Sequence, residues 1–205
     1  MFLKYVYKST SYSLVISRLT ILTIIQIIEL MGKVKSGENA IVFVAKDYLG
    51  NELSLASYKG KKVLLGFYRG TACPFCLGRV KRLLEFYEEL KSKGINVIVI
   101  IPAKQESIFE TSKKTIAPFP IIADPEKKIF KQYGIIDSKF VILKAMVKPF
   151  KMMKVMLTNP FSMKLFEEAS MLPAEILING EFKIDIAHYG NHLGDHIPLQ
   201  KILNK

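Results

Sequence analysis

The chain has 205 residues, of which half are apolar and 23% are charged, as in an ordinary globular protein. A chain of this length buries a sizeable core unaided, and two cysteines exclude a disulfide-rich secreted scaffold. Thirty Lys and Arg residues against 18 Asp and Glu residues give a net charge of +12. Only four of the basic residues are arginines and the lysines are scattered, so we interpret the excess as a solvated basic surface and expect no nucleic-acid partner.

Residues 1–32 differ from the rest of the chain. An apolar run from Leu14 to Leu30 has ten residues in its longest uncharged stretch, whereas a membrane-spanning helix needs about 20. No small-residue cleavage site follows, so a secretory signal fits poorly. A short membrane anchor, a packed or interfacial helix, and sequence outside the working protein remain open as interpretations. We expect one domain over residues 33–205.

From residue 37 the sequence alternates between strand and helix patterns. Strands are predicted at 41–45, 52–55, 62–68, 96–101, 119–123, 174–178 and 182–187. Helices are predicted at 74–93, 105–112, 124–133 and 197–203. The continuous apolar run KVLLGFY at 62–68 is typical of a strand buried on both faces. With the helix and strand that follow it, this strand forms a unit that predicts a right-handed parallel crossover.

The order of these elements predicts the fold class. Residues 138–171, rich in methionine and interrupted by prolines, are expected to form an irregular helical insertion. Asn179–Gly180 after it predicts a tight hairpin. We therefore predict an α/β fold with a mixed central sheet flanked by helices on both faces. An N-terminal strand pair precedes the sheet, and the insertion precedes the last hairpin.

Cys73 and Cys76 lie directly between a predicted buried strand and the longest predicted helix. At a helix N-terminus, unpaired N–H groups and the helix dipole stabilise a thiolate and lower its pKa from about 8.5 to between roughly 3.5 and 7.5. The second cysteine lies within one turn and can close a disulfide after the first has reacted. Arg69 and Arg79 add positive potential. The spacing therefore predicts a redox-active cysteine pair.

Two other interpretations of the cysteine pair remain open. A structural zinc site needs two further ligands, and these would have to be histidines because the chain has no other cysteine. Two inert buried cysteines are the other alternative. Three histidines recur at intervals of four near the C-terminus: His188, His192 and His196. Glycines among them argue against a helical metal-binding face, and a polar turn is the simpler interpretation.

Pro173 stands immediately before the predicted strand 174–178. A proline entering a strand of this type is often cis and can pack against active-site sulfurs. We therefore include Pro173 in the predicted site. A simple strand-start proline is the alternative.

Three stretches carry a resemblance to a known family. They are SGENA…DYLGNELSLASYKGKKVLLGFYRGTACPFC, IIADPEKKIFKQYGI and LPAEILINGEF…AHYG. Over about residues 36–205 the chain resembles the alkyl hydroperoxide reductase/thiol-specific antioxidant (AhpC/TSA) family, and more narrowly its peroxiredoxin-like branch with an RGxxCPxC motif. The resemblance implies a thioredoxin fold and reduction of a peroxide or a disulfide, with electrons from a thioredoxin- or glutaredoxin-type donor.

The resemblance gives two opposite assignments of the cysteines. Peroxiredoxins carry a proline, a threonine four residues on, and the peroxide-attacking cysteine three residues after that. Aligning the Phe-Tyr pair puts Arg69 at the proline, Cys73 at the threonine and Cys76 at the peroxidatic cysteine. Thioredoxin logic instead makes Cys73 the nucleophile and Cys76 the resolving cysteine. We favour the second assignment because Cys73 is nearer the cap and is expected to be more exposed, and it makes dithiol–disulfide exchange better supported than peroxide reduction.

The family comparison also bears on other residues. Tyr68 and Thr71 are expected to line the site. Glu175 is either the proton acceptor that thioredoxin-like proteins place beneath the resolving thiol or an exposed strand residue.

The sequence thus predicts an antioxidant thiol-dependent oxidoreductase whose two cysteines cycle between dithiol and disulfide, without a cofactor or a metal. Arg69, Thr71 and Pro173 complete the predicted site. The expected compartment is the cytoplasm, with membrane anchoring through residues 1–32 as the alternative. A non-catalytic thioredoxin-fold binding module and a CxxC/His metal-binding protein are the competing functions.

Overall fold

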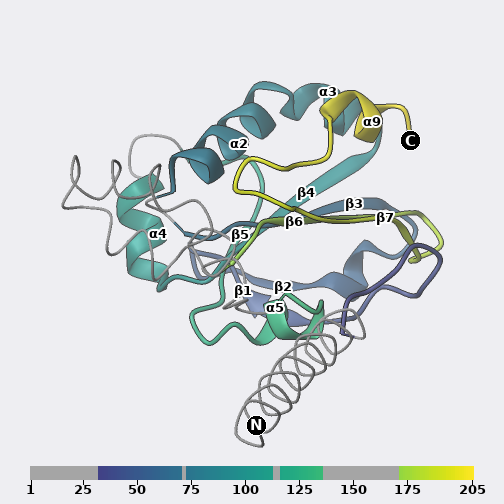
Figure 1. Ribbon diagram of the computed structural model, residues 1–205. Coiled ribbons are helices and arrows are strands. Elements are labelled where there is room, and N and C mark those ends of the chain that lie inside the picture. Colours follow the sequence, from purple (N-terminus) through teal and green to yellow (C-terminus); the bar gives the residue numbers. More distant parts are fainter. Residues whose placement is uncertain (1–31, 71–72, 113–115, 136–170) are drawn as a thin grey trace, which may run out of the picture.

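The computed structural model describes residues 32–70, 73–112, 116–135 and 171–205, and its centre is a five-stranded sheet in the order β5-β4-β3-β6-β7 (Figure 1). The strands are β3 (Lys62–Phe67), β4 (Ile95–Ile101), β5 (Ile121–Ala123), β6 (Ala174–Ile178) and β7 (Ile184–Tyr189). β3, β4 and β5 pair in parallel, whereas β6 and β7 are antiparallel to their neighbours. The mixed sheet and the predicted parallel crossover are confirmed. A separate antiparallel pair, β1 (Val44–Lys46) and β2 (Glu52–Ser54), confirms the N-terminal strand pair.

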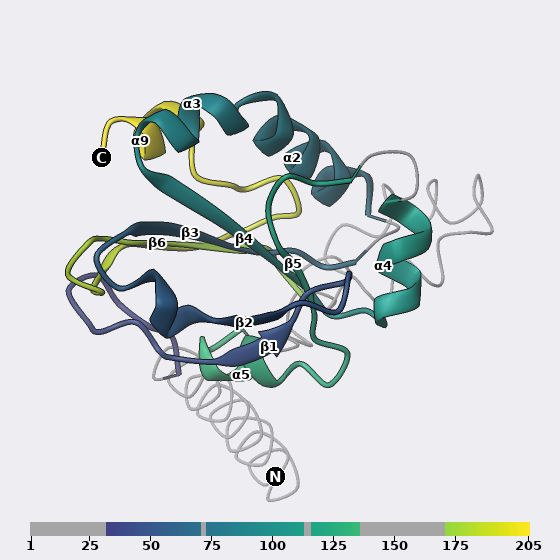
Figure 2. The same cartoon turned by 180° about the vertical axis from the view of Figure 1, so that it is seen from behind.

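Helices lie on both faces of the sheet, as predicted. One face is covered by α2 (Pro74–Glu85), α3 (Tyr87–Ser92) and α9 (Leu199–Leu203). On the other face lie the 3-10 helix η1 (Leu55–Tyr58), α5 (Lys128–Gln132) and the β1–β2 pair (Figure 2). In both views α4 (Gln105–Ser112) lies beside the end of the sheet at which α2 begins.

Two apolar cores fill the space between the sheet and its two covers. Successive strand side chains point to opposite faces, so Leu64 belongs to the core under α2 and α3, whereas Val63 and Leu65 belong to the core on the other face. The continuous apolar run of β3 is thus explained, because both of its faces are covered. Cys73 and Cys76 belong to the core under α2.

Several element boundaries differ from the predictions. The helix predicted at 74–93 is two helices that meet at Phe86, whose ψ of 10° departs from the helical value, and no proline or glycine in the sequence marks this break. The helix predicted from Asp124 begins only at Lys128 because Lys127 has a left-handed φ of 56°. Asp124 still caps it, since its carboxylate accepts the N–H groups of Lys128, Ile129 and Phe130 at 2.8, 2.9 and 3.1 Å.

Near the C-terminus, the strand predicted at 182–187 is observed at 184–189, because Phe182 takes a left-handed φ of 63° in the turn. The terminal helix begins at Leu199 after Pro198. Three predictions lie outside the described residues: the N-terminal segment up to residue 31, Thr71, and the insertion up to residue 170. In the part of the chain that the structure describes, every helix is too short or too polar to cross a membrane.

Candidate active site

The Cys-x-x-Cys motif lies between the central strand β3 and α2, at the N-terminus of the helix. Cys73 is the N-cap of α2 with extended φ and ψ of −81° and 114°, and Pro74 occupies the first turn, where its missing N–H is not needed. The carbonyl of Cys73 accepts the first helical hydrogen bond from the Leu77 N–H at 2.9 Å. Both cysteines are free thiols, and one turn of helix brings them together at the helix start, as the spacing predicted.

The two thiols interact with one another and differ strongly in acidity. A hydrogen bond from the Cys76 thiol is the main reason that the pKa of Cys73 falls to about 6; burial opposes it, and the backbone N–H groups of Cys76 and Phe75 and the charge of Arg69 assist. The same hydrogen bond, together with burial, raises the pKa of Cys76. At neutral pH the pair therefore holds a Cys73 thiolate beside a protonated Cys76 thiol.

Exposure does not distinguish the two sulfurs, and this part of the prediction is wrong. Cys73 is 1% exposed and Cys76 is 2% exposed, because both side chains turn into the core between α2 and the sheet. Phe75, between them in the sequence, points outward and is 54% exposed. The loop after β7 lies against it, since a Cβ on Gly194 would lie 3.4 Å from the Phe75 ring. The difference between the cysteines is one of electrostatics and hydrogen bonding.

A buried polar cluster lies between β6 and α2, the helix that carries the cysteine pair, and Glu175 is at its centre. Glu175 lies on β6 opposite Gly66 of β3 and is completely buried. The Tyr68 ring folds back over Gly66, where any Cβ would come within 2.7 Å of it, and the Tyr68 hydroxyl donates to Glu175 Oε1 at 2.6 Å. Burial and the neighbouring Glu175 charge raise the pKa of Tyr68, so the hydroxyl stays protonated and able to donate.

Arg79 ties this cluster to the helix that carries the cysteines. It lies on α2, three residues after Cys76, and its Nε and Nη2 donate to the two oxygens of Glu175 at 2.7 and 2.9 Å. Its Nη2 also donates to the carbonyl of Ile197 at 2.9 Å. The N–H of Ile197 in turn donates to Glu175 Oε2 at 2.8 Å. These bonds attach α2 to β6 and to the segment before α9. The charge of Arg79 is therefore committed to Glu175, whereas the positive potential at Cys73 comes from Arg69.

Glu175 does not fit either role that the sequence suggested. It is not an exposed strand residue. Burial alone would raise its pKa, but His196, the charge and hydrogen bonds of Arg79, and the Tyr68 hydroxyl together lower it to about 2. A carboxylate with so low a pKa is a poor proton acceptor at neutral pH, and its contacts make it the structural anchor of α2.

His188 lies on β7, and His192 and His196 follow it in the irregular segment before α9, so the three histidines do not share a helical face; only the last two fit the polar turn expected between strand and helix. His188 Nε2 lies 2.9 Å from Asp195 Oδ1, and Asp195 also accepts the Asn191 N–H at 2.7 Å. His196 packs edge-on against Tyr68, with its Nδ1 3.5 Å from Glu175. Among the residues with described positions, no three His, Cys, Asp or Glu side chains gather as metal ligands would.

Pro173 stands immediately before β6, and the cis form that is frequent for such prolines is not observed here. Every peptide bond in the described ranges is trans. Pro173 is buried, and its carbonyl accepts the Gly190 N–H at 2.8 Å. A Cβ at Gly190 would lie 3.0 Å from that carbonyl and 2.8 Å from the Asp195 carbonyl, so the site's C-terminal loop closes tightly here.

The sequence singled out the members of the buried cluster one at a time and missed the cluster itself. The cluster consists of Tyr68, Arg79, Glu175 and His196, which are up to 128 positions apart in the sequence. They meet because β6 pairs with β3 and because Arg79 of α2 and His196 before α9 both reach Glu175. A signal was present in the polar residue Glu175 within an otherwise apolar buried strand, AEILI. Such a residue requires partners, and Arg79 is one of few arginines in the chain.

The strand order and the paired cysteines at the start of α2 define a thioredoxin-fold protein with a dithiol centre. Two solved structures support the fold. The thioredoxin domain of a thiol-disulfide oxidoreductase from Bacteroides vulgatus has a TM-score of 0.54 at 20% identity, covering 84% of this chain and all of that one. The peroxidoxin BcpB from Mycobacterium tuberculosis has a TM-score of 0.61 at 13% identity, covering 83% and 94%. Sequence comparison identifies the family: residues 36–187 match the AhpC/TSA family, and the chain belongs to it.

Among curated relatives, the chain is similar to the chloroplastic peroxiredoxin Q of Sedum lineare, with 31% identity over 111 residues, 54% of this chain and 60% of the relative. The first relatives that it matches are covered over 48–66% of their length. The family resemblance read from the sequence is thus confirmed. The narrower branch with the RGxxCPxC motif stays a prediction.

Proposed function

We propose that this protein is a thiol peroxidase in which Cys73 is the nucleophile and Cys76 the resolving thiol. The observation that carries the proposal is the asymmetry of the pair: Cys73 has a pKa of about 6, and the pKa of Cys76 is raised. A thiolate is the reactive form of cysteine, whereas a protonated neighbour supplies a proton and attacks later. Membership of the AhpC/TSA family and similarity to proteins named peroxiredoxin support a peroxide as the substrate.

The cycle has three steps. The Cys73 thiolate attacks one oxygen of the peroxide ROOH, the O–O bond breaks, and Cys73 becomes a sulfenic acid while ROH leaves with a proton. The Cys76 sulfur, having given its proton to the departing oxygen, then attacks the Cys73 sulfur as a thiolate, forming the disulfide and releasing hydroxide, which takes up a proton from solvent to become water. A dithiol reductant reduces the disulfide to the two thiols and itself becomes oxidised.

The surroundings of the pair support this division of roles. The Cys76 S–H donates to the Cys73 sulfur, and in the proposed cycle it gives its proton to the leaving oxygen. The positive charge of Arg69 lowers the pKa of Cys73 and so keeps its sulfur in the thiolate form. Thr71 and Pro173 belong to the proposed site through the sequence pattern, Pro173 as a buried residue at the start of β6.

Burial of both sulfurs favours a small substrate. Cys73 and Cys76 are 1% and 2% exposed, so any substrate needs an opening to reach them, and hydrogen peroxide or a small alkyl hydroperoxide needs a smaller opening than a folded protein disulfide. This reverses the preference for disulfide exchange reached from the sequence. The reductant is a thioredoxin- or glutaredoxin-type dithiol protein, and the protein acts in the cytoplasm, with anchoring by residues 1–32 as the alternative.

Peroxide consumption and insulin disulfide reduction, measured on one purified sample with a thioredoxin system, test the proposal. We expect hydrogen peroxide to be consumed faster than insulin is reduced, and Cys73→Ser to abolish consumption. Cys76→Ser is expected to react once and then stop, forming a mixed disulfide with an added small thiol. Faster insulin reduction would contradict the proposed substrate, and turnover by the Cys73→Ser variant would reverse the roles of the cysteines.

A further inference from the structure

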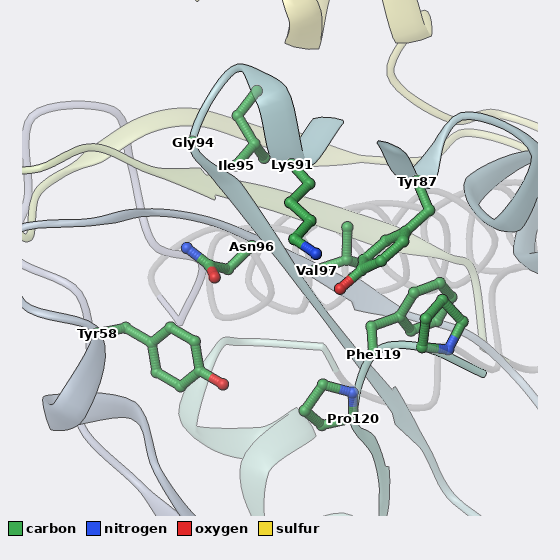
Figure 3. A pocket seen from close by; sticks show the side chains of 10 residues that line it. Tyr58, Tyr87, Lys91, Gly94, Ile95, Asn96, Val97, Phe119 and Pro120 are labelled. Carbon is green, nitrogen blue, oxygen red and sulfur yellow. The ribbon is translucent and has the colours of Figure 1, made fainter. Parts of the chain in front are cut away.

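A cavity of about 260 Å³ lies at the end of the sheet opposite to the cysteines. Because β3 and β4 run in parallel and β3 ends toward the cysteines, the beginning of β4 lies at the far end. The cavity is lined there by Ile95, Asn96 and Val97 of β4 and by side chains from three other segments (Figure 3). It is thus separate from the proposed peroxidase centre.

The cavity lies beside the first half of β4, where β5 is too short to pair with it. β5 pairs only with the second half of β4, from Val99 to Ile101. The Val99 N–H donates toward the β5 side, to the carbonyl of Pro120, and alternation along the strand points the N–H and C=O of Val97 to the same side. Among the described residues no backbone group pairs with them there, although Val97 is 2% exposed. A buried peptide group without a partner costs free energy, which a bound polar molecule can recover.

Aromatic rings enclose this gap from both layers of the fold. Tyr87 of α3 contacts Phe119 with ring centroids 5.8 Å apart, and Tyr58 at the end of η1 reaches the cavity from the other side of β4 (Figure 3). Tyr58 and Tyr87 both line this one cavity, from opposite sides of β4 (Figure 3). The walls therefore suit a flat apolar group.

The one charged side chain among the described residues that line the cavity is a lysine. The Lys91 ammonium extends over the Tyr87 ring, 6.0 Å from its centroid, and lies in Figure 3 beside the Tyr87 hydroxyl and Val97. Asn96 already uses its amide nitrogen to donate to the Lys62 carbonyl at 3.1 Å. Of the described residues that line the cavity, none carries a carboxylate. One positive charge without a lining negative charge favours an anion.

We propose that this cavity binds a small organic carboxylate with a flat apolar body. The carboxylate accepts hydrogen bonds from the Lys91 ammonium, the Tyr87 hydroxyl and the Val97 N–H, while the body lies between Tyr58 and Phe119. The backbone edge is mostly buried and the volume is small, so a single ligand fits better than an added peptide strand.

Benzoate is the probe for this site, and benzyl alcohol is its uncharged counterpart. A ligand of this size is expected to bind with a dissociation constant on the order of millimolar. Titration of the full chain, followed by backbone amide NMR, should give saturable shifts at the start of β4 and in α3. Absence of saturation by about 20 mM benzoate, well above that range, would overturn the proposal.

Variants separate the site from general attraction to a basic protein. Lys91→Met keeps most of the side-chain stem and should weaken benzoate binding about fivefold or more, because a charged hydrogen bond is lost. Lys93→Met makes the same change in net charge outside the cavity and should leave binding unchanged. Equal effects of the two variants, equal affinity for benzyl alcohol, or shifts centred on Cys73 would each refute the carboxylate site. Because no redox step is involved, the test is independent of the proposed peroxidase.

Discussion

Replacing Cys76 by alanine should shift the titration of Cys73 toward the ordinary thiol range. The Cys76 thiol contributes the largest lowering of the Cys73 pKa, to about 6, and alanine removes that donor. Cys76→Ser is the matched control, because it also removes the second sulfur but keeps a hydroxyl donor. The chain has only two cysteines, so each variant carries Cys73 as its single thiol.

The size of the effect depends on what is measured. At pH 7 a thiol of pKa about 6 is about 90% ionised, whereas a thiol of pKa about 8.5 is about 3% ionised. Intrinsic nucleophilicity rises with pKa, with a Brønsted slope of about 0.4–0.5, so the alkylation rate at pH 7 should fall only about twofold. The thiolate ultraviolet absorbance as a function of pH is therefore the informative assay.

We expect the serine variant to titrate near pH 6 and the alanine variant about two units higher. Circular dichroism before and after the titration checks that both variants remain folded. Coincident titration curves for the two variants would refute the hydrogen-bond explanation and leave the helix terminus and Arg69 as the cause.

Three further predictions concern the buried cluster. Glu175→Gln should destabilise the fold by about 3–5 kcal/mol in chemical denaturation, because it leaves the Arg79 charge buried and unpaired. The Arg79→Met/Glu175→Met double variant should lose less stability than the sum of the Arg79→Met and Glu175→Met losses, and strict additivity would argue against the ion pair. The pKa of Glu175 is about 2 in the folded state and about 4.3 in the unfolded state, so its ionisation contributes about 3 kcal/mol to the free energy of unfolding. This contribution is fully present above about pH 4.3 and is lost as the pH falls toward 2, and Glu175→Gln should lack this pH dependence. Gly66→Ala should cost about 1–3 kcal/mol because the new Cβ collides with the Tyr68 ring at 2.7 Å, whereas Gly78→Ala in α2 meets no atom within 4 Å and should be neutral or stabilising; equal melting temperatures would contradict the tight contact.

Local patterns in the sequence predicted the elements well where one physical signal dominates. Residues 174–178 form β6 as predicted, because an apolar strand is followed by the turn former Asn179. The Cys-x-x-Cys spacing likewise predicted a thiol pair at a helix start. The observed element boundaries differ from the predicted ones where a single backbone conformation sets the end of the element, as the positive φ of Lys127 does before α5.

Long-range packing explains what the sequence left undetermined. The partners of Glu175 lie 96 and 107 positions away along the chain at Arg79 and Tyr68, so no local pattern connects them. The exposure of Cys73 was predicted wrongly because a position at a helix N-cap does not show which other parts of the chain pack over that cap. The contact between the two cysteines, in contrast, follows from their spacing, since one turn of helix puts one sulfur within reach of the other. The backbone N–H groups of Cys76 and Phe75 and the charge of Arg69 then favour the thiolate on Cys73.

Identification of the first oxidised sulfur tests the central claim most directly. The Cys76→Ser and Cys73→Ser variants are treated with one equivalent of hydrogen peroxide in the presence of dimedone and analysed by mass spectrometry. The account predicts a dimedone adduct on Cys73 in the first variant and little or none on Cys76 in the second. A rapid adduct on Cys76 with an unreactive Cys73 would show that the nucleophile had been assigned to the wrong cysteine.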